Sequence, residues 1–309
     1  MTNLIVLAAL LTTCILGACE QNIPTAPVAE TTNSWTLTWS DEFNGAAGAG
    51  VNTADWIYTT GHGYSCAACP ANWGTGEIET MSNSTANVFQ DGTGNLVIKP
   101  IRAGSTAGSP WTSGRIETQR TDFQAATGGV VAFESRIQLP NVTGAAAQGY
   151  WAAFWVVGAP FRNTYTNWPS IGEIDILENV NGKNSWWGTL HCGIARGGPC
   201  NEPIGIGSGE VTGGWSPTLQ AGYHVYRAEY DKSTSPEEIR WYVDGIQHWT
   251  VKATAIDTAT WKNATNHGFF IIFNVAIGGG WPGNPTEQTR SGAPMFVDYV
   301  RVYNRSGLP

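Results

Sequence analysis

Charged side chains are scarce in this sequence of 309 residues, and basic side chains are the scarcer kind. Asp, Glu, Lys and Arg make up 13% of the chain, against about 25% in a typical soluble protein. The formal net charge is -8, and no run of Lys and Arg occurs. Because nucleic-acid-binding proteins carry such a run, we expect no nucleic-acid partner. A sulfated or carboxylated polymer also favours a basic surface, so we expect a neutral ligand.

The sequence also lacks an apolar run of the length typical of a membrane span. An N-terminal apolar run, residues 4–11, precedes the small residues Leu16-Gly17-Ala18, a pattern typical of an export signal. The same residues followed by Cys19 resemble a bacterial lipobox, in which Cys19 carries a lipid anchor after cleavage. Both interpretations of residues 1–19, a signal peptide or a lipoprotein signal, stay open. Either one predicts bacterial-type export, as a secreted protein or a cell-envelope lipoprotein.

Long amphipathic helical patterns and internal repeats are absent as well. Residues 20–33 are polar and rich in Thr, Ala and Pro, which is typical of a linker. We expect a single globular domain over residues 34–305, which is long enough to bury a large core. The 38 Gly and 15 Trp of the chain fit short strands, tight turns and stacking surfaces.

Runs of alternating, β-branched or aromatic residues predict strands throughout this domain. The runs lie at residues 35–39, 96–98, 130–139, 223–230, 239–243, 246–251 and 269–275. Asp244-Gly245 separates two of them and predicts a hairpin, because Asp-Gly tolerates the positive φ of a type I′ turn. Many short strands with Gly and Pro turns predict an all-β fold, a sandwich or β-jelly roll.

Four of the six cysteines lie inside the domain. In an oxidising compartment, pairing between nearest neighbours predicts the disulfides Cys66–Cys69 and Cys192–Cys200. Cys66 and Cys69 could instead form half of a zinc site. Zinc is the weaker alternative, because the other two cysteines are spaced too widely for a matching pair of ligands.

Three carboxylates alternate with apolar residues in the segment 172–179, Gly-Glu-Ile-Asp-Ile-Leu-Glu-Asn. On a strand, Glu173 and Asp175 share one face, whereas strict alternation places Glu178 on the other face, in the core. A lone buried carboxylate is costly. A β-bulge at Ile176-Leu177 returns Glu178 to the acidic face, and bulges are frequent beside active sites.

Two carboxyl groups on one face fit the cleavage of a glycosidic bond. With retention of configuration, one carboxylate attacks the anomeric carbon, and the other group protonates the leaving oxygen and then activates water. A third acid between them separates their pKa values. The alternative is a solvated face without function, which is disfavoured because like charges on one strand face repel each other.

The motif Glu-Ile-Asp-Ile-Leu-Glu at 173–178 resembles the signature of glycoside hydrolase family 16, in its laminarinase-like (endo-β-1,3-glucanase) branch. The two-residue gap between Asp175 and Glu178 resembles that branch, whereas the lichenases of the family have a one-residue gap. Further motifs follow in the order of the family over nearly the whole domain, at 39–45, 73–80, 92–98, 112–116, 151–155, 168–170, 188–192, 276–283 and 295–303.

The resemblance implies a concanavalin A-like β-jelly roll, a sandwich of two curved antiparallel sheets with an open substrate cleft. It implies that Glu173 is the nucleophile, Asp175 its helper and Glu178 the acid/base. The reaction would be retaining, endo-acting hydrolysis of a laminarin-like β-1,3-glucan by a monomer that needs no cofactor for catalysis. A mixed-linkage β-1,3-1,4-glucanase or a transglycosylase of the family would use the same acids. A non-catalytic glucan-binding module would have lost them.

The resemblance also implies a set of substrate-binding side chains: Arg115, Trp155, Trp168, His191, Asn274 and Trp281. Trp168 would stack on a sugar near the cleavage point, because indole offers a flat partner to the apolar C–H face of a sugar. Asn274 and Trp281 would line the far end of the cleft. For Trp155, packing in the core stays open as the alternative.

For two members of this set, specific polar partners are expected. His191 would hydrogen-bond the substrate or Glu178, and the alternative is a buried neutral histidine with one backbone partner. Arg115 would bind a sugar hydroxyl or a carboxylate, and the alternative is that it neutralises Glu117 or Glu134.

The last implication is a structural calcium ion. Asp298 would bind it together with backbone oxygens near Glu42 and Gly92, since ligation by oxygen alone suits calcium. The alternative is a surface Asp that caps a turn. The loop 192–200 also resembles a disulfide-closed loop of some laminarinase-like members.

Overall fold

The computed structural model describes Met1 and residues 34–306. The predicted export signal and linker fall on residues outside this part, as does Cys19. Among the described residues, no helix is long and apolar enough to cross a membrane. The strands of the described residues run from Thr36 to Arg305, inside the predicted domain.

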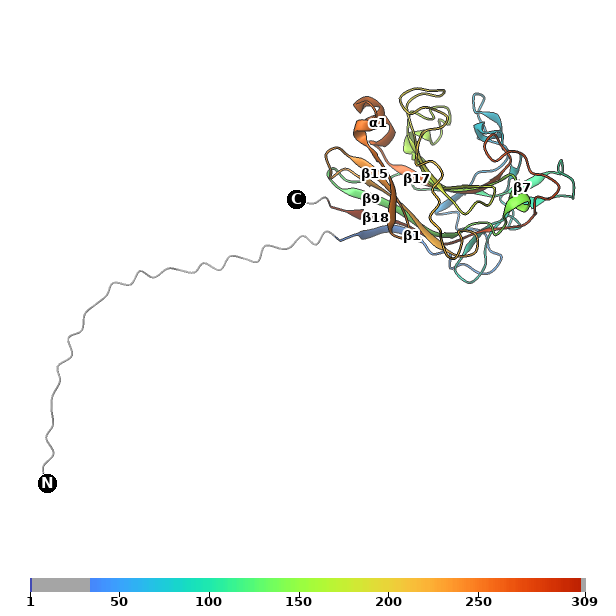
Figure 1. Cartoon of the computed structure of the whole chain (residues 1–309), viewed down its shortest axis with the longest axis horizontal. Coiled ribbons are helices and arrows are strands. Elements are labelled where there is room, and N and C mark those ends of the chain that lie inside the picture. Colours follow the sequence, from blue (N-terminus) through green and yellow to red (C-terminus); the bar gives the residue numbers. More distant parts are fainter. Residues whose placement is uncertain (2–33, 307–309) are drawn as a thin grey trace. The chain divides into compact units, whose positions relative to one another are not determined.

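Eight strands form one antiparallel sheet. Their bounds are β1 (Thr36–Asp41), β4 (Val88–Gln90), β5 (Leu96–Ile98), β9 (Val130–Gln138), β14 (His224–Asp231), β15 (Glu238–Val243), β16 (Ile246–Lys252) and β18 (Met295–Arg305). The order is β16-β15-β14-β9-β18-β5-β4, and β1 pairs with β18. Figure 1 shows β1, β18 and β9 in this layer. The predicted hairpin is confirmed between β15 and β16, where Asp244 and Gly245 have φ values of 50° and 77°.

Seven strands form a second antiparallel sheet. Their bounds are β2 (Trp56–Tyr58), β8 (Arg115–Thr118), β10 (Tyr150–Gly158), β11 (Glu173–Val180), β12 (Trp187–His191), β13 (Ile206–Gly207) and β17 (Phe269–Ile277). The order is β13-β12-β11-β10-β17-β8-β2. The acidic segment therefore forms β11, between β12 and β10.

A small third sheet and a few helical turns complete the described elements. The sheet consists of β3 (Thr80–Met81), β6 (Ile101–Arg102) and β7 (Trp111–Ser113), and β3 and β7 pair in parallel. The helical elements are η1 (Ala71–Gly74), η2 (Gly144–Ala147), η3 (Ala159–Phe161), η4 (Ala253–Ala255) and the α-helix α1 (Thr258–Thr265). Asp257 caps α1 by accepting hydrogen bonds from the backbone N–H groups of Ala259 and Thr260. In Figure 1, α1 and β7 lie at opposite ends of the domain.

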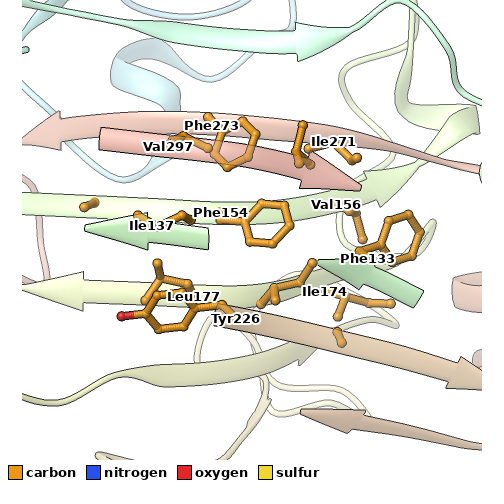
Figure 2. Packing of buried hydrophobic residues seen from close by; sticks show 14 of the residues in the cluster. Phe133, Ile137, Phe154, Val156, Ile174, Leu177, Tyr226, Ile271, Phe273 and Val297 are labelled. Carbon is orange, nitrogen blue, oxygen red and sulfur yellow. The ribbon is translucent and has the colours of Figure 1, made fainter. Parts of the chain in front are cut away.

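The core lies between the two large sheets, because each strand turns every second side chain inward. Figure 2 shows side chains from both sheets packed there: Phe133, Ile137, Tyr226 and Val297 from the eight-stranded sheet, and Phe154, Val156, Ile174, Leu177, Ile271 and Phe273 from the seven-stranded sheet. Phe154 and Phe273 stack with ring centroids 4.8 Å apart. The predicted all-β jelly roll of two antiparallel sheets is therefore confirmed.

Candidate active site

The carboxylates of Glu173, Asp175 and Glu178 lie on the face of the seven-stranded sheet that is turned away from the core, called here the outer face. On both sides of β11 the pairing register shifts by one residue after Asp175. Ile176 is the extra residue, so the bulge expected at Ile176-Leu177 is confirmed. Ile176 and Leu177 are both buried in the core. The bulge therefore returns Glu178 to the face of Asp175.

The bulge is supported from the opposite sheet. The buried Trp241 of β15 donates its indole N–H to the main-chain oxygen of Asp175 over 2.7 Å. A bulge disrupts the regular ladder, and this bond gives a buried carbonyl a partner. Trp241 reaches β11 past Gly188, where an added Cβ would lie 2.7 Å from the indole ring. A larger residue at position 188 would therefore displace the indole that supports the bulge.

The pKa values of the two glutamates on either side of Asp175 are both raised. Burial, and then the neighbouring charge of Asp175, raise the pKa of Glu178 well above its ordinary value. The indole N–H of Trp151 donates to Glu178 Oε1 over 3.0 Å, which opposes this shift. Burial and Asp175 also raise the pKa of Glu173 to about 8, while His191 opposes them. The cluster therefore retains protons at neutral pH, because three close carboxylates do not all ionise.

His191 lies beside the acids and is held by two carboxylates. Its Nε2 is 3.3 Å from Asp175 Oδ2, and its Nδ1 is 2.7 Å from Glu202 Oε2. Burial by itself would lower the pKa of His191, but the hydrogen bonds to Asp175 and Glu202 outweigh it and raise that pKa well above its ordinary value. The alternative of a buried neutral histidine with one backbone partner is therefore wrong.

The structure corrects the protein partner predicted for His191. The prediction named Glu178, but the carboxylates next to the ring are those of Glu202, hydrogen-bonded to Nδ1, and Asp175, 3.3 Å from Nε2. The register explains the difference, because His191 lies opposite Glu173 in the ladder, whereas Glu178 lies opposite Trp187, farther along β12. The bulge lengthens this separation by one residue on β11.

Ligand-type atoms of Glu173, Asp175 and His191 lie within 4.8 Å of one another. Such a group can hold a cation, and in this structure Nδ1 of His191 is hydrogen-bonded to Glu202 while Nε2 lies 3.3 Å from Asp175 Oδ2.

Trp281 lies near the acids, in a group of three tryptophans. Its ring makes edge contacts with Trp151 and Trp187, with centroids 5.5 Å and 5.0 Å away. Trp281 is 43% exposed, so its ring is open to a ligand. The prediction placed Trp281 with Asn274 at the far end of the cleft. The structure places Trp281 beside Trp151, which donates to Glu178.

Asn274 and Trp155 are hydrogen-bonded to each other on the outer face. The indole N–H of Trp155 donates to Asn274 Oδ1 over 2.8 Å. Trp155 lies opposite Asp175 in the ladder between β10 and β11, and it is partly exposed. The alternative of packing in the main core is therefore wrong for Trp155.

Trp168 lies on the loop between β10 and β11, next to His191. The two rings have centroids 5.6 Å apart and are tilted by 44°. Trp168 packs against a second apolar cluster on the outer face, which contains Phe161. Tyr64 and Tyr165 stack over the same cluster, with centroids 4.0 Å apart. Aromatic side chains therefore border the acids on this side, opposite the group of Trp281.

Arg115 is buried on β8, where it joins several aromatic side chains. Its guanidinium donates to the hydroxyl of Tyr64 over 2.7 Å and lies 3.4 Å from Glu117 Oε1. The rings of Trp73 and Trp155 lie 4.6 Å and 4.8 Å from the guanidinium carbon. Stacked arginines of this kind are stabilised by the negative face of the ring.

These contacts give Arg115 a carboxylate partner, as predicted, and leave its predicted contact with a sugar hydroxyl a prediction. The side chain is 4% exposed, and its donors are directed to protein groups. The alternative of neutralising Glu117 is confirmed. Glu134 lies on the other sheet and pairs with Arg227 at 3.0 Å. Arg115 therefore orders the side chains of the outer face.

Both predicted disulfides are confirmed. Cys66 and Cys69 are bonded with a Cα–Cα distance of 5.2 Å, and Cys192 and Cys200 with 5.5 Å. The zinc alternative for Cys66 and Cys69 is wrong, because their sulfurs are bonded to each other. The second disulfide closes the loop that leads from His191 to Glu202.

The residues predicted to hold calcium are engaged in ion pairs. Asp298 Oδ2 accepts from Arg136, and Glu42 forms a two-pronged pair with Arg301 at 2.8 Å and 2.9 Å. The two arginines already neutralise part of the negative charge that a cation beside Asp298 and Gly92 would neutralise. Calcium therefore stays a prediction.

Three residues of the site were missed in the sequence: Glu202, Trp151 and Trp187. A signal existed for two of them. Trp151 precedes Trp155 by four residues, and Trp187 precedes His191 by four, so period-two alternation places each pair on one face. Glu202 has no such signal, since it reaches His191 from a loop eleven residues farther on.

Family models match two adjoining parts of the chain. Residues 141–203 match the model "XgeA-like, catalytic GH16 domain", and residues 204–308 match "Beta-glucan synthesis-associated protein SKN1/KRE6/Sbg1". Among curated relatives, a beta-glucanase of Rhodothermus marinus is 31% identical over 87% of this chain and 85% of its own length. The clotting factor G alpha subunit of Tachypleus tridentatus is 32% identical, and the chain spans 34% of that protein.

A solved structure is closer in sequence. The endo-1,3-beta-glucanase of Streptomyces sioyaensis is 53% identical, with a TM-score of 0.84 over 92% of this chain and 99% of that chain. The Rhodothermus and Streptomyces relatives match 87% and 92% of this chain, and the family model over residues 141–203 includes β11, the strand that carries the three acids. The chain belongs to glycoside hydrolase family 16, in its laminarinase-like branch.

Proposed function

We propose that this chain is a retaining endo-β-1,3-glucanase that hydrolyses a neutral, laminarin-like glucan. The observation that carries the proposal is the bulge at Ile176, which brings Glu173 and Glu178 to one face of β11. Retaining hydrolysis needs two carboxyl groups on one face, roughly 5–5.5 Å apart. The alternation of a regular strand would have buried one of them in the core.

The first step forms a covalent intermediate. An ionised oxygen of Glu173 attacks the anomeric carbon while the bond from that carbon to the glycosidic oxygen breaks. The carboxyl group of Glu178 gives its proton to the departing oxygen. Burial and the charge of Asp175 raise the pKa of Glu178, which favours the protonated form that a general acid requires.

The second step releases the sugar. Glu178, now ionised, takes a proton from a water molecule, and the water oxygen attacks the anomeric carbon. The ester bond to Glu173 breaks, and its carboxylate is restored. Two inversions at one carbon leave the product in the β configuration of the substrate.

Asp175 and His191 make the first step feasible. The reaction needs Glu173 ionised, but Asp175 beside it favours the protonated form. The cationic ring of His191 favours the ionised form of Glu173 and binds Asp175. Asp175 thus lies between the nucleophile and the acid, where it separates their proton affinities.

A neutral sugar polymer fits the side chains around the acids. Trp168 borders them on one side, and the exposed Trp281 borders them on the other. Indole rings stack on the apolar faces of sugars. The name of the Streptomyces relative, an endo-1,3-beta-glucanase, supports β-1,3 linkages as the target of this chain.

The proposal is tested by the reducing ends released from laminarin, curdlan, barley mixed-linkage glucan, cellulose and agarose. Wild-type protein is compared with Glu173→Gln, which keeps the shape of the nucleophile but not its charge. We expect release from laminarin and curdlan that the substitution abolishes. Faster release from barley glucan than from laminarin would favour the mixed-linkage alternative. Binding without release from any of the five would favour a glucan-binding module.

We also propose the surroundings in which the protein acts. Bacterial-type export, with or without a lipid on Cys19, is supported by the residues at the N-terminus and agrees with two disulfides in the domain. The protein would act as a monomer.

We further propose a structural calcium ion at Asp298. If the ion is bound, the melting temperature of the protein should fall when a chelator is added.

A further inference from the structure

Glu202 is a buried acid that the reaction steps above leave unused. Its side chain has no exposure to solvent, and both of its oxygens are occupied. Oε1 accepts a hydrogen bond from the backbone N–H of Cys192 over 2.8 Å. Oε2 lies 2.7 Å from Nδ1 of His191. A carboxylate that is buried to this extent needs such partners.

The position of Glu202 is determined by a closed loop. The disulfide between Cys192 and Cys200 joins the end of β12 to the residues before Glu202. Inside the loop, the backbones of Gly197 and Glu202 exchange two hydrogen bonds, of 2.6 Å and 2.7 Å. The Glu202 carboxylate is thereby held next to Nδ1 of His191 with little freedom to move.

The hydrogen bonds determine the protonation of His191. An ionised carboxylate only accepts hydrogen bonds, so each ring nitrogen that faces one must carry a proton. Nδ1 faces Glu202, and Nε2 faces Asp175 at 3.3 Å. The charged groups around this ring are Asp175 and Glu173 on β11, and Glu202 on the loop. These neighbouring carboxylates raise the pKa of His191 well above its ordinary value, against the effect of burial, and so favour the cationic form of the ring.

We propose that Glu202 is a positioning residue of the glucanase: it orients His191 and keeps a proton on Nδ1, so that Nε2 donates to Asp175 between the two working glutamates. The Cys192–Cys200 disulfide holds Glu202 in place for this role. The kinetic part of the inference rests on the function proposed above. In metal sites and catalytic triads, a carboxylate that hydrogen-bonds one ring nitrogen of a histidine orients the ring and fixes its tautomer in the same way.

The test compares Glu202→Gln with Glu210→Gln as a matched control. The amide of the first variant can still accept from Cys192, but its NH₂ group faces Nδ1 and removes the need for a proton there. Glu210 lies away from the acids, paired with Lys183 on the surface, and its substitution makes the same change in net charge. We measure kcat and KM on laminarin and follow the ring of His191 by NMR, assigned by its loss in His191→Gln.

For Glu202→Gln we expect kcat to fall roughly 10- to 100-fold with little change in KM, as for a misplaced group near the reaction. His191 should lose its proton at a lower pH than in wild type, whereas Glu210→Gln should match wild type in both measurements. An unchanged kcat, or an unchanged titration of His191, would overturn the inference.

Two further outcomes stay decisive. If Glu202→Gln does not fold, the wild-type titration decides, because a His191 that loses its proton in the range of a free histidine contradicts the inference. If wild-type protein cleaves no glucan, the proposed function fails. The titrations of wild type and Glu202→Gln then still decide whether Glu202 governs His191.

Discussion

Trp241 of the eight-stranded sheet donates its indole N–H to the main-chain oxygen of Asp175, in the other sheet, over 2.7 Å. The bond crosses the core and ends at the bulge that sets the acids on one face. The geometry of the active site therefore depends on packing between the sheets as well as on the sequence of β11.

Replacing Trp241 with Phe removes this donor and leaves an aromatic ring in the core. We expect a loss of about 1–3 kcal/mol in the free energy of unfolding, since a buried carbonyl is left without a partner. We also expect kcat on laminarin to fall, because the bulge is less well held. Urea unfolding and kinetics check the two effects. Full activity in a protein destabilised by this amount would show that the bulge does not need the bond.

Replacing Glu178 with Gln removes the proton donor but leaves the nucleophile. We expect activity on laminarin to fall by roughly 10²- to 10⁴-fold, the usual contribution of general acid catalysis. An aryl glucan oligosaccharide with an acidic phenol as leaving group needs little protonation, so its initial cleavage should suffer far less. Stopped-flow release of the phenol measures this step. Equal losses on both substrates would contradict the role of Glu178 as the acid.

The raised pKa of Glu173 predicts how stability depends on pH. Its pKa is about 8 in the folded protein and returns to an ordinary value near 4.5 on unfolding. Between these values the folded state holds more protons at this site, so this group's contribution to stability falls as pH rises. Glu173→Gln should therefore gain stability over wild type from pH 4.5 to 8. Urea unfolding at several pH values checks this, and a constant difference would contradict it.

The fold and much of the site could be predicted because the signals are local. The bulge followed from the cost of burying Glu178, and the disulfides followed from the spacing of the cysteines. Contacts that depend on how distant segments meet could not be predicted in this way. The bond from Trp241 joins residues 66 positions apart. Glu202 reaches His191 only because a loop folds back, and Arg115 has partners on two segments.

The stacked pair Phe154 and Phe273 tests the account of the core. Phe154→Ala should lower the free energy of unfolding by about 3–5 kcal/mol, because it leaves a cavity between the sheets. Leu37→Ala, at a side chain that is half exposed, is the control and should stay within about 0.5 kcal/mol of wild type. Guanidinium unfolding measures both variants. A small effect of Phe154→Ala would mean that this part of the core repacks.

The stereochemistry of the first product tests the central claim most directly. Proton NMR during hydrolysis of laminarin, with enough protein to outpace mutarotation, shows which anomer of the new reducing end forms first. A nucleophile at Glu173 and an acid at Glu178 predict the β anomer, with the α anomer appearing later by mutarotation. Initial release of the α anomer would mean that water attacks the glucan directly, and it would contradict the covalent role of Glu173.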